Sequence, residues 1–240
     1  MNSASGFNPP PHRPNPPPHL SRRGFLRRTL LAPAALSALR SLSAAADSAG
    51  YQLGCYTRPW DAHPYEVALD GIAEAGFLYA GLMTAKGKTW VMITVDSTPD
   101  EVAAIAQAVT QRGLKTLSIY GGDFPVQTSI AAGIAGLRRL IDHCVICQCP
   151  HLMLGGTGEA SLAAAYYKVV AECCDDAHEK SVGLSIKPHG GTNATGPQCR
   201  RIIEQIGHPN FRLWYDPGNI FYYSDGALDP VADATTVDGL

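Results

Sequence analysis

The chain has 240 residues, with 19 basic and 21 acidic side chains and a formal net charge of −2. Residues 1–46 contain six arginines and no acidic residue, so the rest has 13 basic against 21 acidic residues, a formal charge of −8. Such a surface repels phosphate backbones, and no basic stripe is present, which argues against nucleic acid as a partner. No run approaches about 18 apolar residues, so we expect no stable membrane span.

The N-terminal segment has the features of an export signal. Residues 21–28 match a twin-arginine motif, residues 29–39 are mainly apolar, and residues 44–46 form a small-residue cleavage site. The Pro-rich stretch at 9–18 is typical of an extended leader. We therefore predict a twin-arginine signal peptide with its leader in residues 1–46, the Tat translocon as a partner during export, and a periplasmic or extracellular location.

From residue 50 onward, short runs suited to strands alternate with longer runs of helical periodicity. Strands are expected at residues 51–56, 78–83, 114–120, 151–154, 182–187 and 211–216. Helices are expected at residues 64–75, 99–112, 127–144, 160–180 and 197–206, with another beginning near 229. The second helix has the clearest start, because Thr98 can cap it, Pro99 suits its first position and two acids follow.

This alternation predicts an α/β fold with a parallel sheet. A doubly wound sheet is the alternative, but it needs a glycine-rich phosphate turn after an early strand, and the sequence at 57–60 is Thr-Arg-Pro-Trp. The glycine-rich stretch at 155–158 comes too late and lacks the lysine of a P-loop. We predict a (β/α)8 TIM barrel over residues 47–240. About six of its eight units are present, because a complete barrel takes about 250 residues, and we expect the domain to be incomplete at its C-terminus.

The chain contains seven cysteines, an odd number for an exported protein. One group, together with two histidines, has the spacing of a metal site; its members are His143, Cys144, Cys147, Cys149 and His151. The alternative is that these small side chains pack in the core, as we expect for the adjacent pair at 173–174. Disulfide pairing stays open.

Polar side chains gather where two apolar strands end. Lys187 and His189 follow the strand expected at 182–187, and Asp216 and Asn219 follow the strand expected at 211–216. In a parallel barrel, such strand ends meet at the catalytic rim. The simpler alternatives are that Asp216 only caps a turn and that Lys187 only pairs with an acid.

These two strand ends, 187–191 and 216–219, together with the opening strand, resemble the xylose-isomerase-like TIM barrel superfamily, also called the sugar phosphate isomerase/epimerase family. The resemblance covers roughly residues 51–230. It implies a divalent cation (Mn, Mg, Co or Zn), with Asp216 in the place of the ligand that ends the sixth strand. Asn219 falls where a substrate-contacting residue often follows. Lys187 replaces the glutamate that usually ends the fifth strand, and a charged lysine cannot ligate a metal.

The resemblance implies an enzyme that isomerises or epimerises next to the carbonyl of a sugar or sugar derivative. We expect Lys187, His189 and Glu159 to be catalytic, Asp216 to bind the metal, and a carbohydrate to contact the three residues Asn219, Tyr222 and Trp60. Export argues against a phosphorylated substrate. The alternatives are a non-catalytic carbohydrate-binding barrel and a sugar lyase or dehydratase on the same fold. The sequence leaves open which sugar and which metal bind, and the oligomeric state.

Overall fold

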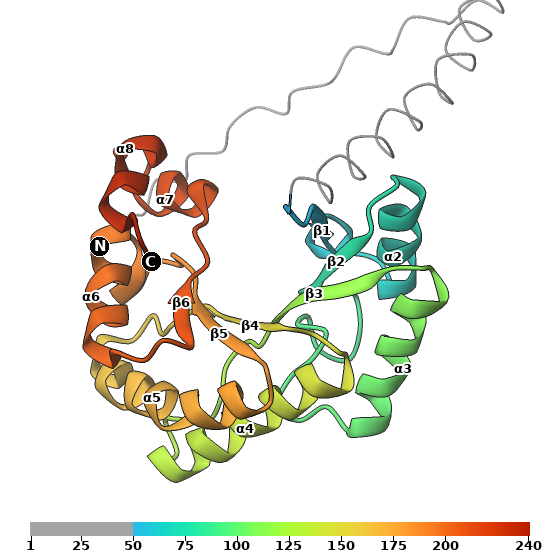
Figure 1. The fold of residues 1–240 in the computed structure, drawn as a ribbon, viewed down its shortest axis with the longest axis horizontal. Coiled ribbons are helices and arrows are strands. Elements are labelled where there is room, and N and C mark those ends of the chain that lie inside the picture. The colour runs from blue at the N-terminus through green and yellow to red at the C-terminus, as the bar shows by residue number, and fades with distance from the viewer. Residues whose placement is uncertain (1–49) are drawn as a thin grey trace, which may run out of the picture. The chain divides into compact units, whose positions relative to one another are not determined.

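The computed structural model describes residues 50–240, so the predicted signal peptide lies outside the described residues. Its six parallel strands form one curved sheet in the order β1-β2-β3-β4-β5-β6 (Figure 1). The strands are β1 Gly54–Tyr56, β2 Tyr79–Leu82, β3 Lys115–Tyr120, β4 His151–Leu154, β5 Gly183–Ile186 and β6 Phe211–Leu213. Each strand pairs with the next one along the chain, without the reversal that defines a doubly wound sheet. The predicted parallel α/β fold is confirmed, and the sheet of the described residues is open between β1 and β6.

Helices cover the outer side of the sheet (Figure 1). They are α2 Tyr65–Glu74, α3 Pro99–Gln111, α4 Ile130–Ile146, α5 Ala163–Glu179 and α6 Gly196–Ile206. Two short helices, α7 Pro217–Tyr223 and α8 Pro230–Ala234, follow β6 and lie beyond its carboxyl end (Figure 1). Local sequence sets their ends: Thr98 and Thr195 each form a capping box, at the starts of α3 and α6, and Gly207 ends α6 in the left-handed conformation. None of the helices within residues 50–240 is both long and apolar enough to cross a bilayer.

The period of two along each strand separates an apolar face from a polar one. Ile119, Leu152 and Ile186 are fully buried in the core shared with the helices. Their neighbours Met153 and Lys187 line a cavity on the other face. The strands therefore support the core on one face and line a cavity of mixed character on the other.

Two elements differ from the sequence-based expectation. The last strand ends at Leu213 and not at 216, and after residues 214–216 a short helix, α7, begins at Pro217. The Pro-Gly pair at 217–218 is typical of a turn, but proline also suits the first turn of a helix. The helix expected at 160–180 divides into a 3-10 turn at Ala160–Leu162 and α5.

The metal hypothesis for the cysteine-rich segment is wrong. All seven cysteines are free, and among residues 50–240 no group of three or more His, Cys, Asp or Glu could hold a metal ion. Cys144, Cys147 and Cys149 belong to the hydrophobic core. Burial explains their spacing, because the segment runs from the end of α4 into the buried strand β4.

Stability should fall as the pH is lowered from about 7 to about 5, because three histidines resist protonation in the folded chain. Burial is the first cause that lowers the pKa of His143, His151 and His189. Below the unfolded value of about 6.5, the unfolded chain binds protons first, and this favours unfolding. Urea denaturation at several pH values measures the effect. In the variant His143→Gln the free energy of unfolding should depend less on pH than in the parent chain. The exposed control His178→Gln should keep the pH dependence of the parent. If the free energy of unfolding changes equally with pH in the parent and both variants, the prediction is wrong.

Candidate functional site

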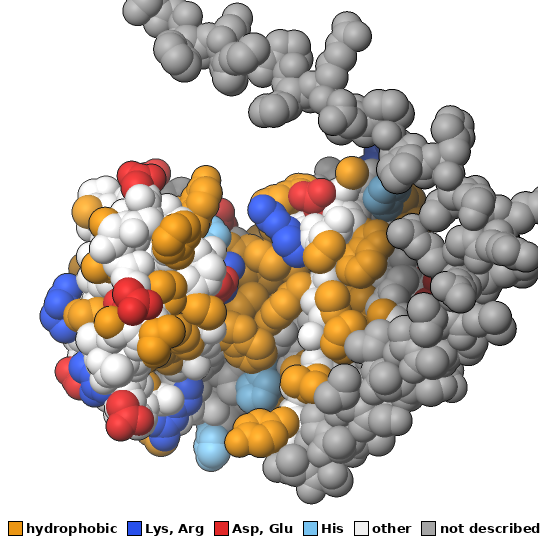
Figure 2. Space-filling view, turned by 90° about the horizontal axis from the view of Figure 1, so that it is seen from above, with side chains coloured by type: hydrophobic (Ala, Val, Ile, Leu, Met, Phe, Trp, Pro, Cys, Tyr) orange, Lys and Arg blue, Asp and Glu red, His pale blue; other side chains and the backbone are white. Residues whose placement is uncertain are grey.

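A cavity of about 650 Å³ opens at the carboxyl ends of the strands. Figure 2 shows the hollow in this face, with hydrophobic side chains covering much of its interior. The lining side chains come from both edges and the middle of the sheet: Tyr56, Arg58, Met83, Trp90, Tyr120, Met153, Lys187, His189, Trp214, Asp216, Asn219, Tyr222 and Tyr223. The site has the size and mixed lining of a small-molecule pocket.

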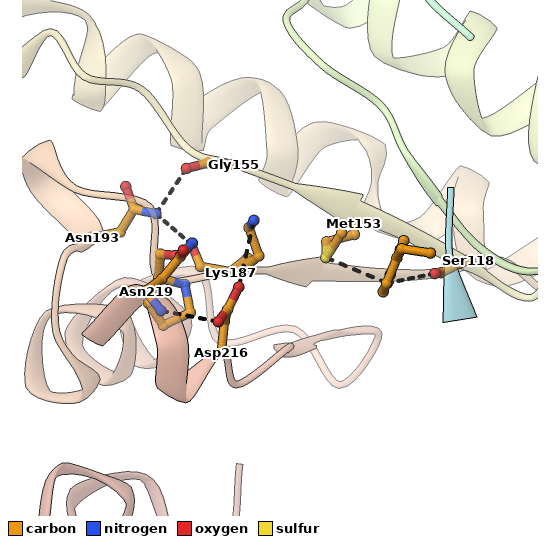
Figure 3. A network of polar contacts seen from close by, with 9 residues as sticks. Ser118, Met153, Gly155, Lys187, Asn193, Asp216 and Asn219 are labelled. Atoms are coloured by element: carbon orange, nitrogen blue, oxygen red, sulfur yellow. Dashed lines mark hydrogen bonds and ion pairs between the residues drawn. The ribbon is translucent and has the colours of Figure 1, made fainter. Parts of the chain in front are cut away.

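Lys187 lies next to Asp216 inside this cavity (Figure 3). Its backbone N–H donates to the carbonyl of Leu154, which fixes the residue at the end of β5. The Nζ atom lies 3.6 Å from Asp216 Oδ2, and the exposed fractions of the two side chains are 8% and 31%. The same Nζ lies 5.6 Å from the centre of the Tyr120 ring. The amine is therefore enclosed by an aromatic ring and a single carboxylate.

The surroundings lower the pKa of both the Lys187 amine and the His189 imidazole. Burial lowers the pKa of Lys187, although the Asp216 carboxylate opposes the shift. The pKa of His189 is lowered first by burial and then by the positive charge of Lys187. A neutral imidazole in the same cavity as a lysine whose pKa is lowered is an arrangement suited to proton transfer.

Asp216 has a structural task besides its contact with Lys187. It caps α7, because its Oδ1 accepts the backbone N–H of Asn219 at 3.0 Å. The Asn219 side chain in turn donates from Nδ2 to the carbonyl of Pro188 at 2.6 Å. Capping and ion pairing thus involve different oxygens of Asp216, and Asn219 joins the ends of β5 and β6.

Asn193 connects the ends of β4 and β5, a role that no sequence motif indicates. Its fully buried side chain donates from Nδ2 to the carbonyls of Gly155 at 2.9 Å and Lys187 at 2.7 Å (Figure 3). Gly156 makes room for it, since a Cβ at this position would collide with the Asn193 side chain. The position of Lys187 therefore depends on a residue six places further along the chain.

Aromatic rings form the walls of the cavity. Tyr56 and Trp214 meet edge to face, with ring centres 6.3 Å apart, and His189 lies between the rings of Tyr120 and Tyr223. The Tyr56 ring lies against Gly81, where a Cβ would collide with it. Such rings offer flat apolar surfaces to the C–H faces of a ligand.

The mouth of the cavity carries a further cation. The Arg58 guanidinium stacks over the Trp90 ring, 4.1 Å from its centre, and the Trp90 indole N–H donates to Asp61. Within residues 50–240, Arg58 makes no ion pair at 4.0 Å or less. It can therefore meet a polar or anionic group of a ligand at the entrance.

The cavity brings together most of the predicted site residues. Those that line it are Lys187, His189, Asp216, Asn219 and Tyr222.

Two of the predicted site residues lie elsewhere. Glu159 is exposed beside the 3-10 turn Ala160–Leu162, and Trp60 packs against Gly71 of α2. Neither lines the cavity. Tyr56 and Tyr120 could have been found from the sequence, because each ends a strand on the same rim.

The donor set does not fit the divalent cation that the resemblance implies. Among residues 50–240, Asp216 is the only carboxylate that lines the cavity, and its Oδ1 already accepts a hydrogen bond. Lys187 fills the space beside it with hydrogen-bond donors. Hard divalent cations need several oxygen ligands, and the described residues supply no group of three ligands of suitable type. We therefore assign no metal to these residues.

Comparisons with known proteins agree on the fold. A family model described as xylose isomerase-like TIM barrel matches residues 69–238. No curated protein sequence is significantly similar to the chain.

Three of the solved structures that are similar to this chain share its fold at low sequence identity. A xylose isomerase domain protein from Planctomyces limnophilus is 17% identical, with a TM-score of 0.53 over 70% of this chain and 64% of its own. A xylose isomerase-like TIM barrel protein from Mycobacterium smegmatis, in complex with magnesium, is 15% identical. Its TM-score is 0.59 over 78% of this chain and 71% of its own. A D-allulose 3-epimerase from Methylomonas sp., in complex with D-allulose, is 16% identical. Its TM-score is 0.58 over 78% of this chain and 70% of its own. The chain thus spans about two thirds of the length of these proteins.

Proposed function

The chain belongs to the xylose isomerase-like TIM barrel family, and we propose that it is an isomerase or epimerase acting next to the carbonyl of a sugar or sugar derivative. The observation that carries the proposal is the pairing of a half-buried imidazole with a buried amine in one aromatic-walled cavity. Isomerisation and epimerisation both need a base for a C–H proton and a group that stabilises the electrons left behind.

We assign the base to His189. Because burial lowers its pKa, the ring is neutral near pH 7 and can accept a proton. Its place between the rings of Tyr120 and Tyr223 restricts its orientation. Lys187 activates the carbonyl, and Asn219 and Tyr222 contact the hydroxyl groups of the sugar.

The test is exchange of substrate C–H protons with solvent. Free ketohexoses and aldohexoses are incubated with the chain in deuterium oxide, and deuterium incorporation next to the carbonyl is followed by NMR. Replacing His189 with Gln should slow the exchange by about 10²–10⁴-fold, the usual contribution of a general base. Glu159→Gln is the matched control, because Glu159 is exposed and outside the cavity; its exchange rate should stay that of the parent.

A non-catalytic carbohydrate-binding barrel predicts a different result. The aromatic walls would still bind a sugar, so calorimetry would detect binding of one of these sugars without any exchange of its C–H protons. Binding without exchange would therefore reject the proposed enzyme and favour the binding protein.

The proposal includes export, which the arginine pair in residues 1–46 supports. An exported enzyme meets free or oxidised sugars in place of phosphorylated ones. Replacing Arg22 and Arg23 together with Lys should leave the uncleaved precursor in the cytoplasm. Fractionation of cells followed by mass measurement of the chain checks this, and a normal yield of cleaved, exported double mutant would contradict it.

A further inference from the structure

Lys187 differs from the ion-paired lysine elsewhere in the same chain. Lys180 on the surface lies 2.7 Å from Asp142 and 3.0 Å from Asp176, the distances of charge-assisted hydrogen bonds. Lys187 is much more buried, yet its nearest carboxylate oxygen is 3.6 Å away. Within residues 50–240, its Nζ makes no hydrogen bond of 3.5 Å or less. The buried Lys187 amine thus has one carboxylate partner, at a longer distance than either partner of the surface lysine.

The surroundings of Lys187 favour a reactive amine. The groups that face it are the Asp216 carboxylate, the Tyr120 ring and, further away, the positive charge of Arg58. Burial and Arg58 favour the neutral amine, and Asp216 alone opposes them. A desolvated lysine in an apolar pocket is the kind of amine that attacks carbonyl carbons.

We propose that Lys187 forms a Schiff base with the carbonyl carbon of the substrate, so that the protein itself supplies the electron sink for the reaction. This inference rests on the proposed function, since it names how the carbonyl is activated. The substrate class is narrowed to sugars that present a free aldehyde or ketone, in open-chain form, to the floor of the cavity.

The steps balance without any further reactant. The neutral Nζ attacks the carbonyl carbon and forms a C–N bond, while the carbonyl oxygen takes up a proton to give a carbinolamine. The C–O bond then breaks, the oxygen leaves as water with a second proton, and a protonated imine remains on Lys187. Asp216 Oδ2, which lies on the amine side, is placed to pass these protons.

His189 then removes the proton from the adjacent carbon, and the electron pair of the C–H bond moves into the imine to give an enamine. His189 passes its proton to solvent, and a water molecule on the opposite face gives a proton to the same carbon, which inverts the carbon and completes an epimerisation. Addition of water to the imine releases the carbonyl and restores the amine. Nothing is oxidised or reduced over the whole cycle.

Reductive trapping tests the inference on the unaltered chain. Dihydroxyacetone and D-fructose serve as probes, with sodium cyanoborohydride to reduce any imine to a stable amine. We expect one adduct, heavier than the chain by the mass of the probe less one oxygen atom. Peptide mapping should place this adduct on Lys187 and not on Lys180. Adducts spread evenly over the exposed lysines, with none on Lys187, would overturn the inference.

Two variants separate this inference from the proposed function. Lys187→Arg keeps the positive charge but cannot form an imine, and Lys180→Arg is the matched surface control. Loss of the adduct and of C–H exchange in Lys187→Arg alone supports the Schiff base. Exchange in the parent chain without an adduct rejects the Schiff base but retains the isomerase, whereas an adduct without exchange retains the imine and rejects the isomerase. Because trapping uses the parent chain, a variant that fails to fold leaves the test intact.

Discussion

Replacing Lys187 with Arg should lower C–H exchange by at least about 10²-fold, the scale on which loss of one electrostatic or nucleophilic group slows an enzyme. Arg keeps the charge beside Asp216, so folding should be retained better than in a neutral variant. Its guanidinium does not deprotonate in proteins, and it therefore cannot attack a carbonyl carbon. The measurement is deuterium incorporation under saturating sugar, with circular dichroism to establish that the variant is folded.

The variant Lys187→Glu gives the opposite test. It supplies the carboxylate that the resemblance implies at the end of the fifth strand and places it about where Lys187 now meets Asp216. If Lys187 is the reactive amine, this variant should lose both the trapped adduct and the exchange. Retained exchange together with tight binding of Mg²⁺ or Mn²⁺ would show that the lysine is a tolerated replacement in a metal site.

The two possible electron sinks require different surroundings. A metal ion must be held by several oxygen or nitrogen ligands, whereas an imine needs one amine that loses its proton readily. In this cavity a single carboxylate lies among aromatic rings, the Lys187 amine, the His189 imidazole and the Arg58 guanidinium. That composition stabilises a neutral amine better than it stabilises a divalent cation.

The sequence predicted the fold because the positions of its apolar runs and the positions of its helical segments agreed on one alternating pattern. Short apolar runs recur with helical segments between them, and strand β4 was predicted at the residues where it occurs, 151–154. The strand ends were also informative, since Lys187 and Asp216, 29 places apart in the chain, lie 3.6 Å apart in the cavity. The two simpler alternatives both occur, because one oxygen of Asp216 caps α7 and the other pairs with Lys187.

The remaining site residues depend on geometry that the sequence does not display. Arg58 and Trp90 meet only because the loop after β2 folds back, with a bridge between Thr84 and Val91. Glu159 follows a strand on the same rim, but the chain turns it outward into solvent. A position after a strand end therefore indicates the correct rim and not the direction of the side chain.

Among residues that do not react with the substrate, we expect Asn193 to have the largest effect on both stability and C–H exchange. Replacing it with Ala leaves the carbonyls of Gly155 and Lys187 without their buried donor. Each lost partner costs about 1–3 kcal/mol, so the free energy of unfolding should fall by about 2–5 kcal/mol in urea denaturation. Because these bonds fix the backbone of Lys187, C–H exchange should also slow in the molecules that remain folded.

Asn210 is a matched control for Asn193 at the opposite end of the strands. Its side chain donates from Nδ2 to the carbonyls of Cys174 at 3.3 Å and Val182 at 2.9 Å, away from the cavity. Asn210→Ala should lower stability less, because this side chain is only partly buried, and should leave the exchange rate per folded molecule unchanged. If both variants slow exchange equally, the effect comes from general loosening of the fold. If only Asn193→Ala slows it, Asn193 is a positioning residue for Lys187.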